Sequence, residues 1–357
     1  MTKQPLVSVV MVIRDVEKFL PQAIESVLNQ TFRDFEFLIV DFGSRDKSKQ
    51  LAAGYAARDA RIRLSEIPPC SYIAAKIAAC SLPNGRYIAI QDADDVSLPE
   101  RLEVEVDFLE KHTEVGLLGG AVQWIDSEGN FLVSDDDYPT EDQEIRRELR
   151  VRNTFWHPTV LMQKEAFTRV GGYRPAFTQS DDYDLWLRIS EHYQCANLKR
   201  KVLYYRIHPQ QLSLRKRKDQ ILCALAAQAA AALRKAGKSD PLDTAKEITP
   251  ELLVKMGVGE AQQQKELASG YFGYIKHMYE ARGYSAVTEA AAEMFTVCSE
   301  KYLEPRFVSE MHLLCAKAFW KQGKAMQSLV ATARAGIAHP RVLGRPFKPL
   351  FRRARFL

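Results

Sequence analysis

Apolar and polar residues alternate with two different periods along the first hundred positions of the chain. Residues 7–13, VSVVMVI, form the continuous apolar run that is typical of a buried strand. Residues 16–30 then carry apolar side chains at helical spacing, and Asp15 is the predicted N-cap of that helix. The alternation continues with predicted strands at 35–41, 61–65 and 86–91 and helices at 45–58 and 72–81. Strands that alternate with helices predict an α/β fold with a mostly parallel sheet and helices on both faces.

The simple alternation ends after the first hundred residues. A helix is predicted at 98–112, with Ser97 as its N-cap and Pro99 in its first turn. Strands are expected near 115–125, followed by a tight turn at 127–130.

The C-terminal part of the sequence has a different texture. From about residue 219 the pattern is one of alanine-rich amphipathic helices, with no segment that reads as a strand. Helices are predicted at 219–236, 260–282, 285–301, 306–322 and 324–338. We therefore expect a sheet domain at 1–215, an all-α domain at 216–340 and a tail at 341–357.

Composition and charge narrow the function classes. The chain has 357 residues, of which 46% are hydrophobic, and its net charge is only +5, so bulk charge does not indicate nucleic-acid binding. Its six cysteines show no CxxC spacing, so we expect reduced thiols and no zinc site. No apolar run is long enough to span a bilayer, and we expect a cytoplasmic protein.

Two basic stretches stand out locally. They are 215–218, RKRK, and the tail 341–357, which has six basic residues and no acidic one. The tail also interleaves Phe and Leu with its charges, which suits an anionic membrane surface better than a nucleic acid. A plain solvated chain end is the default interpretation of such a tail, and peripheral membrane contact through 341–357 is the alternative.

An acidic turn carries the first candidate chemistry. Asp92, Asp94 and Asp95 follow a predicted buried strand, at the sheet edge where α/β proteins bind their ligands. Carboxylates there suit Mg²⁺ or Mn²⁺, which takes one or two of them together with substrate phosphate oxygens. In isolation such a turn is more often a solvated helix cap.

Several further segments give the acidic turn its context. They are, in chain order, VSVVM, SVLNQTFRDFEFLIVDFGSRD, GRYIAIQDADDVSLPERLE, HPTVLMQKEAFTRVGGYRPAF, DDYDLWLRI and YYRIHPQQLS. Together they resemble the family 2 glycosyltransferases, whose GT-A fold is a Rossmann-like sheet, over residues 5–214. The resemblance implies an inverting sugar transfer from a nucleoside-diphosphate sugar, with a UDP-sugar favoured, to a hydroxyl of a glycan or lipid-linked acceptor in polysaccharide biosynthesis.

The resemblance also implies roles for individual residues. Asp182 matches the catalytic base, and Asp94 matches the position that binds Mn²⁺ or Mg²⁺, with His208 as a further metal ligand or diphosphate contact. The implied donor-binding residues are Val12, Arg14, Asp41, Phe42, Lys76, Asp92, Asp94 and Asp95. The implied acceptor-binding residues are Trp156, His157 and Asp181.

The residues themselves support these roles in part. Asp181, Asp182 and Asp184 crowd negative charge at a predicted helix start, which can raise the pKa of one of them toward that of a base. A plain acidic first turn is the alternative. Trp156 is either a sugar-stacking platform or core, and Trp186 is predicted to be core.

One departure from the family pattern affects the nucleotide. The second strand of relatives ends in two acids, the second of which recognises the base, whereas this chain has Asp41 and Phe42. Phe42 cannot accept a hydrogen bond but can stack on a base, and Asp41 or Asp46 is a candidate substitute. Arg14 is a candidate phosphate contact. A scaffold protein that has lost donor binding is therefore the alternative function.

Overall fold

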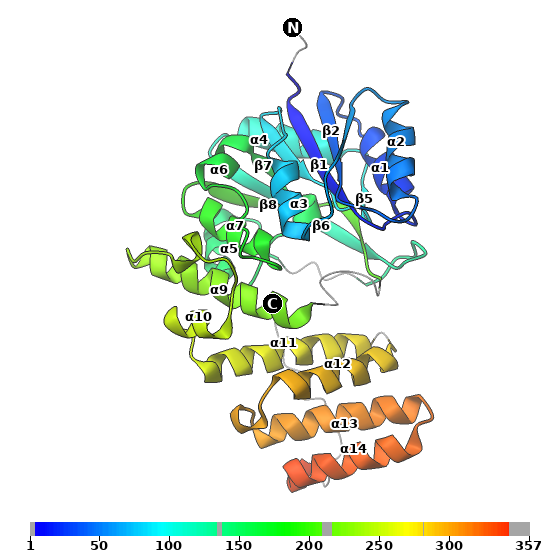
Figure 1. The fold of residues 1–357 in the computed structure, drawn as a ribbon, viewed down its shortest axis with the longest axis vertical. Helices are drawn as coiled ribbons and strands as arrows, with labels where there is room; N and C mark the ends of the chain where they lie inside the picture. Colours follow the sequence, from blue (N-terminus) through cyan, green and yellow to red (C-terminus); the bar gives the residue numbers. More distant parts are fainter. Residues whose placement is uncertain (1–3, 134–137, 209–215, 281, 343–357) are drawn as a thin grey trace. The chain divides into compact units, whose positions relative to one another are not determined.

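The computed structural model describes residues 4–133, 138–208, 216–280 and 282–342. Its N-terminal part is built on one eight-stranded sheet with the order β3-β2-β1-β4-β7-β6-β8-β5 (Figure 1). The strands are β1 (Val7–Ile13), β2 (Phe35–Asp41), β3 (Ile62–Glu66), β4 (Tyr87–Ile90), β5 (Val96–Ser97), β6 (Val115–Ile125), β7 (Leu161–Gln163) and β8 (Gln194–Arg206).

The sheet is mixed rather than purely parallel. The pairs β1–β2, β1–β4, β2–β3 and β6–β8 are parallel, as the alternating pattern predicted. The short strands β5 and β7 pair antiparallel with their neighbours. The α/β fold class is thus confirmed.

Helices cover the sheet and bury its apolar strands (Figure 1). They are α1 (Leu20–Leu28), α2 (Ser48–Ala56), α3 (Tyr72–Cys80), α4 (Arg101–Lys111), α5 (Asp142–Leu149), α6 (Lys164–Arg169) and α7 (Asp181–Ser190). Leu20 and Ile24 of α1 and Phe37 of β2 are fully buried in the same core as Tyr87 of β4. Strands with side chains buried on both faces need no alternation of polar residues, which is why 9–13 and 37–40 are continuous apolar runs.

Two predicted helix caps are wrong. Asp15 has a left-handed φ of 51° and accepts a hydrogen bond from the backbone N–H of Arg45, while α1 begins only at Leu20. Ser97 lies in β5, and its hydroxyl donates to Gln91 inside the protein. In both cases a tertiary hydrogen bond takes the side chain that local propensity would assign to a helix N-terminus.

The turn after β6 forms where it was predicted. Gly129 has a φ of 90°, and the Asp126 carboxylate accepts hydrogen bonds from the backbone N–H groups of Glu128 and Asn130. The short helices α5 and α6, in contrast, were not predicted from the polar sequence around them.

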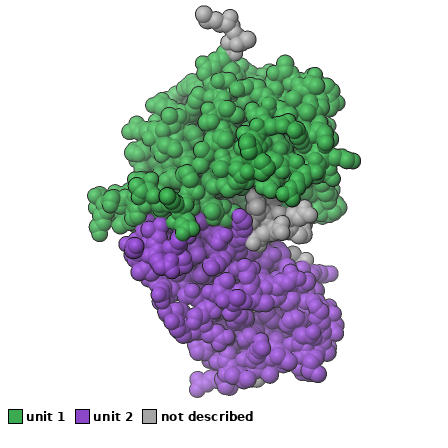
Figure 2. Space-filling model, viewed as in Figure 1, with its two compact units in different colours: residues 1–215, 230–247 green, residues 216–229, 248–357 purple. Residues whose placement is uncertain are grey.

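The C-terminal part is helical, with no strand beyond Arg206 in the part of the chain that the structure describes. The helices are α9 (Arg217–Lys235), α10 (Pro250–Lys255), α11 (Glu260–Glu280), α12 (Tyr284–Val297), α13 (Pro305–Lys321) and α14 (Ala325–Ala338). The chain divides into one compact unit of residues 1–215 and 230–247 and a second of 216–229 and 248–357 (Figure 2). Most of the predicted tail, from residue 343, lies outside the described residues.

Candidate active site

The carboxyl ends of three parallel strands meet at one edge of the sheet. β1 pairs with both β2 and β4, so the strand order reverses between β1 and β4. Such a switch point leaves a crevice beyond the strand ends, where α/β proteins bind ligands. Asp92–Asp95 follow β4 directly, Arg14 follows β1, and Phe42 follows β2. The topology therefore gathers the predicted donor-binding residues at one edge.

The acidic turn is anchored by the end of β8. The Asp95 carboxylate accepts a hydrogen bond from the backbone N–H of Arg206 at 2.7 Å, and the Arg206 guanidinium donates to the backbone carbonyl of Asp94 at 2.8 Å. Burial raises the pKa of Asp95 well above its usual range, and the carboxylates of Asp94 and Asp92 raise it further. Asp95 therefore shapes the turn, while the side chains of Asp94 and Asp92 stay about a quarter exposed.

Asp94 faces His208 across the site. The distance between Asp94 Oδ2 and His208 Nε2 is 2.9 Å, although the two residues are 114 positions apart in sequence. The His208 ring packs against Phe19 with a centroid distance of 4.8 Å. Among the described residues no group of three or more His, Cys, Asp or Glu side chains forms a metal cluster. Asp94 and His208, the two residues predicted as metal ligands, thus lie side by side as one carboxylate and one imidazole.

A second histidine joins the acidic turn to the acceptor side. His157 Nδ1 lies 3.2 Å from Asp92 Oδ1, and its Nε2 lies 3.4 Å from the hydroxyl of Tyr173. Burial alone would raise the pKa of Asp92, but His157, followed by Lys76 and Arg101, holds it below its usual value. Asp92 therefore favours its ionised form, although the same turn carries two other carboxyl groups, those of Asp94 and Asp95.

Lys76 and Asp181 form a buried ion pair. The Lys76 ammonium donates to Asp181 and also lies over the rings of Tyr173 and Tyr72, 4.4 Å and 5.5 Å from their centroids. Burial lowers the pKa of Lys76, but Asp181 and Asp182 more than offset that effect and raise it. The sequence assigned Lys76 to the donor and Asp181 to the acceptor, and the structure places the two side chains in contact.

Asp182, the predicted base, is held from two sides. Its Oδ2 accepts a hydrogen bond from Asn153 Nδ2 at 3.0 Å, and its Oδ1 accepts one from the backbone N–H of Tyr183 at 2.8 Å. Burial raises its pKa, and the neighbouring Asp181 adds to that rise against the opposing effect of His157. A half-buried carboxylate with a raised pKa and a fixed orientation is suited to act as a general base.

Phe42 occupies the predicted nucleotide edge. Its side chain is 5% exposed, lies 6.1 Å from the ring of Tyr72, and has the Arg14 guanidinium 5.4 Å from its centroid. The Asp41 carboxylate accepts hydrogen bonds from the backbone N–H groups of Gly43 and Ser44, at 2.9 Å and 3.0 Å. Gly43 has a φ of 99°, and a Cβ there would lie 2.7 Å from Pro69 Cγ, so the turn requires glycine.

Asp46 is committed to backbone capping. Its two carboxylate oxygens accept hydrogen bonds from the backbone N–H groups of Glu17 and Ser48, both at 2.9 Å. This leaves Asp41, whose Oδ2 is buried without a hydrogen-bond partner among the described residues, as the better placed of the two candidate acids. Val12 lies in register with Val40 on the adjoining strand, one residue before the end of β1.

Comparison with known proteins assigns the family. Residues 8–174 match the model of Glycosyl transferase family 2. The O-antigen biosynthesis glycosyltransferase WbnJ of Escherichia coli is 33% identical to this chain over 208 residues, which cover 57% of this chain and 80% of WbnJ. This chain belongs to the family 2 glycosyltransferases.

Two solved structures are similar to this glycosyltransferase in fold. S. aureus TarS 1-349 in complex with UDP matches it with a TM-score of 0.53 at 13% identity, covering 96% of this chain and 93% of TarS. The mannosyltransferase PcManGT from Pyrobaculum calidifontis, in complex with GDP-Man and Mn²⁺, matches with a TM-score of 0.51 at 15% identity, covering 94% and 87% of the two chains. The expected GT-A-type sheet followed by a helical region is confirmed.

Three residues of this glycosyltransferase that hydrogen-bond to the site residues were not among those predicted from the sequence. Asn153, Tyr173 and Arg206 act through hydrogen bonds to residues 29, 16 and 112 positions away, respectively. Of these, only Arg206 had a local signal, because it precedes His208 in a strand pattern. Trp156 packs at 5.1 Å from the ring of Tyr205 and stays half-buried, whereas Trp186 is fully buried as predicted.

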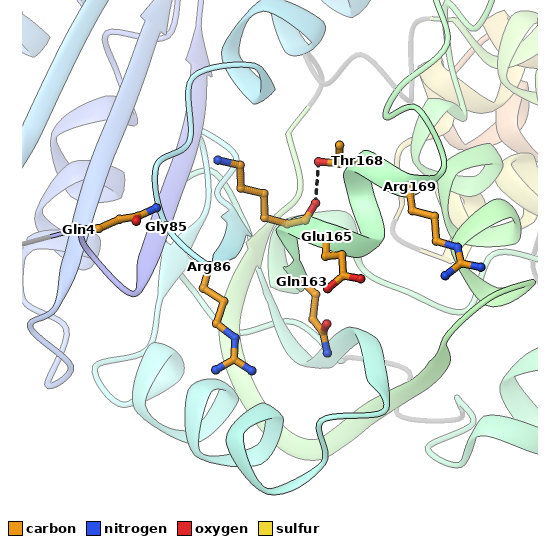
Figure 3. Close-up of a pocket in the computed structure, with 8 residues that line it drawn as sticks. Gln4, Gly85, Arg86, Gln163, Glu165, Thr168 and Arg169 are labelled. Atoms are coloured by element: carbon orange, nitrogen blue, oxygen red, sulfur yellow. Dashed lines mark hydrogen bonds between the residues drawn. The ribbon is translucent and has the colours of Figure 1, made fainter.

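A separate hollow lies beside the start of β4, and Figure 3 shows the side chains that line it. It has a volume of about 560 Å³ and is lined by residues that include Arg86, Gln163 and Glu165. Arg86 precedes β4 and Gln163 ends the antiparallel β7, whereas the acidic turn follows the other end of β4. None of its lining residues belongs to the predicted site, and we place the chemistry at the acidic turn.

Proposed function

We propose that this protein transfers a sugar, with inversion, from a nucleoside-diphosphate sugar to a hydroxyl of a glycan or lipid-linked acceptor, in the biosynthesis of a surface polysaccharide. The observation that carries the proposal is the 2.9 Å distance between His208 and Asp94, which belongs to the acidic turn after β4. The similarity to WbnJ, named for O-antigen biosynthesis, supports the polysaccharide assignment. We assign this chemistry to residues 1–215 and leave the helical region 216–340 outside it.

The donor set of the site fits a divalent cation. One carboxylate and one imidazole would supply two ligands, and a hard cation such as Mn²⁺ or Mg²⁺ commonly completes its shell with substrate phosphate oxygens and water. Asp95 Oδ2, buried beside them without a partner among the described residues, adds a further acidic oxygen to the same turn. Asp94 and His208 would hold the ion, which would neutralise charge on the departing diphosphate.

Asp182 is the proposed base. It accepts the proton of the acceptor hydroxyl as that oxygen bonds to the anomeric carbon and the bond from carbon to diphosphate oxygen breaks. The raised pKa of Asp182 and its hydrogen bond from Asn153 support this role, because a base must be both basic enough and correctly oriented. His157, Trp156 and Asp181 are proposed to bind the acceptor beside it.

The proposed donor edge consists of Val12, Arg14, Asp41, Phe42 and Lys76, with Asp92 and Asp95 behind the diphosphate. Phe42, which is 5% exposed, places an aromatic ring directly after β2 on this edge, and TarS, which shares the fold, is described in complex with UDP. A UDP-sugar is therefore the proposed donor.

Calorimetry with UDP, GDP and dTDP, each with and without Mn²⁺, tests this proposal. We expect UDP to bind in an Mn²⁺-dependent manner, and we expect Asp94→Ala to abolish that dependence. Asp107→Ala, which removes an exposed carboxylate on α4, is the matched control and should bind as the wild type does. Absence of binding to all three nucleotides would favour the alternative, a scaffold that has lost donor recognition at Phe42.

A further inference from the structure

The last described α-helix, α14, has an exposed apolar face. Its large aliphatic side chains are about half or more exposed: Met326 (71%), Leu329 (65%), Val330 (48%) and Ile337 (82%). At 3.6 residues per turn, positions 326, 330 and 337 lie on the same side of the helix. Ala331 and Ala335 lie on the opposite side and are buried. α14 thus packs through its alanines and leaves its larger apolar side chains in solvent.

Hydrogen bonds to α13 fix this orientation of α14. Ser309 of α13 donates from its buried hydroxyl to the carbonyl of Ala335 at 2.8 Å, and Ser328 of α14 donates to the carbonyl of Ala316 at 2.8 Å. Figure 1 shows α14 beside α13 at the end of the helical region. The end of a stack of helices normally presents a polar outer face, because nothing covers it. An apolar face at this position therefore indicates a binding surface.

The charge on α14 itself and on the chain that follows it has one sign only. After Glu310 the chain contains ten Lys and Arg residues and no Asp or Glu. Lys321, Lys324, Arg334 and Arg341 are exposed on or beside α14. Trp320, at the end of α13, is 67% exposed just before the turn into α14. The surface combines aliphatic side chains, a tryptophan and a net positive charge.

This combination selects the partner. A second copy of the chain would bring the same cations against each other, and the tail from residue 343 is itself basic, so neither complements the charge. A nucleic acid would match the charge but offers little to aliphatic side chains. An anionic bilayer matches both, because its headgroups attract Lys and Arg while its acyl boundary takes up apolar side chains and tryptophan.

We propose that the exposed face of α14, with the basic residues around it, binds the surface of a membrane that contains anionic lipid. The helix lies on the membrane and does not cross it, since no described helix is long and apolar enough to span a bilayer. The proposal does not rest on the proposed transfer chemistry. It places the surface on α14 itself, whereas the sequence pointed only to the tail 341–357.

Flotation of the full chain with vesicles tests the proposal. We expect binding to vesicles of phosphatidylcholine with phosphatidylglycerol, weak binding to phosphatidylcholine alone, and loss of binding as salt rises. Leu329→Ser with Ile337→Ser should weaken binding about tenfold or more, because two apolar side chains lose their burial. Val254→Ser, on α10 and 47% exposed, is the matched control and should bind as the wild type does.

Two further variants separate the sources of attraction. Lys324→Gln with Arg334→Gln keeps the apolar face and should weaken binding by roughly 25-fold, about fivefold for each charge. Deletion of residues 343–357 should leave binding that still depends on Leu329 and Ile337. Melting temperatures should be unchanged in the point variants, because all four side chains are exposed.

Three results would overturn the proposal. The first is no binding to anionic vesicles at low salt. The second is binding that the double serine variant leaves unchanged but the deletion abolishes, which would assign it to the tail alone. The third is a dimer in light scattering without lipid that the double serine variant dissociates, which would make the face an interface between copies.

Discussion

The hydrogen bond from Asn153 to Asp182 makes a quantitative prediction about the proposed base. Asn153→Ala removes the 3.0 Å contact from Nδ2 to Asp182 Oδ2. That donor stabilises the ionised carboxylate, so its loss raises the pKa of Asp182, which burial has already raised. A protonated base is inactive, and the acid limb of the activity profile should therefore move to higher pH.

The size of the shift follows from the contact. A hydrogen bond to a charged group contributes about 1.5–3 kcal/mol, and water replaces part of it because Asn153 is only half-buried. A remainder of about 1.4 kcal/mol corresponds to about one pKa unit, or roughly a tenfold loss of rate on the acid side of the profile. Asn153→Asp should move the limb further, because it replaces the donor by a like charge.

Release of nucleoside diphosphate from the donor, measured as kcat/KM against pH, is the assay. Asn84→Ala is the matched control, since it removes a 3.1 Å bond between an asparagine and the Glu36 carboxylate at the other end of β4. It should leave the acid limb in place. An acid limb that stays put in both Asn153 variants, or that moves to lower pH, would refute the role of Asn153 and weaken the assignment of Asp182.

Three other predictions address the metal, the nucleotide and the fold. His208→Ala should raise the Mn²⁺ concentration that gives half-maximal activity by about tenfold or more, because a metal ligand or its support is lost. His112→Ala changes an exposed histidine and should leave that concentration unchanged. EDTA should abolish activity of the wild type. Phe42→Leu should weaken UDP binding in calorimetry by at least about fivefold, because stacking of a base on an aromatic ring contributes about 1–3 kcal/mol. Asp184→Ala should lower the free energy of unfolding in urea by about 3–5 kcal/mol, because it takes the carboxylate from the buried Arg188 guanidinium and leaves the buried Arg174 guanidinium with Asp240 and Asp243 alone. Asp107→Ala, in an exposed ion pair, should cost less than about 1 kcal/mol.

Each of these has a clear contrary result. An unchanged Mn²⁺ requirement in His208→Ala would remove that residue from the metal site. Equal UDP affinity in Phe42→Leu would show that the base contacts another surface. A loss of stability in Asp184→Ala no larger than in Asp107→Ala would mean that solvent reaches the buried guanidinium groups.

The sequence predicted the sheet because its signal is local. A run such as 37–40 is apolar on both faces, and a strand buried on both faces favours that composition. Helix starts depended instead on distant residues. Asp15 and Ser97 have the right chemistry for caps, but each is drawn into a hydrogen bond with another segment, and α1 and α4 begin several residues later.

The candidate site shows the same division. The sequence by itself placed the carboxylates at 92, 94 and 95 after a strand and Asp182 at a helix start, and the resemblance to the family supplied their proposed roles. Only the tertiary structure decided which groups they face: Asp94 meets His208, and Asp182 meets Asn153. Side chains more than a few residues apart are brought together by strand order and loop paths, which no local pattern records, and it is these contacts that orient the carboxylates of Asp94 and Asp182.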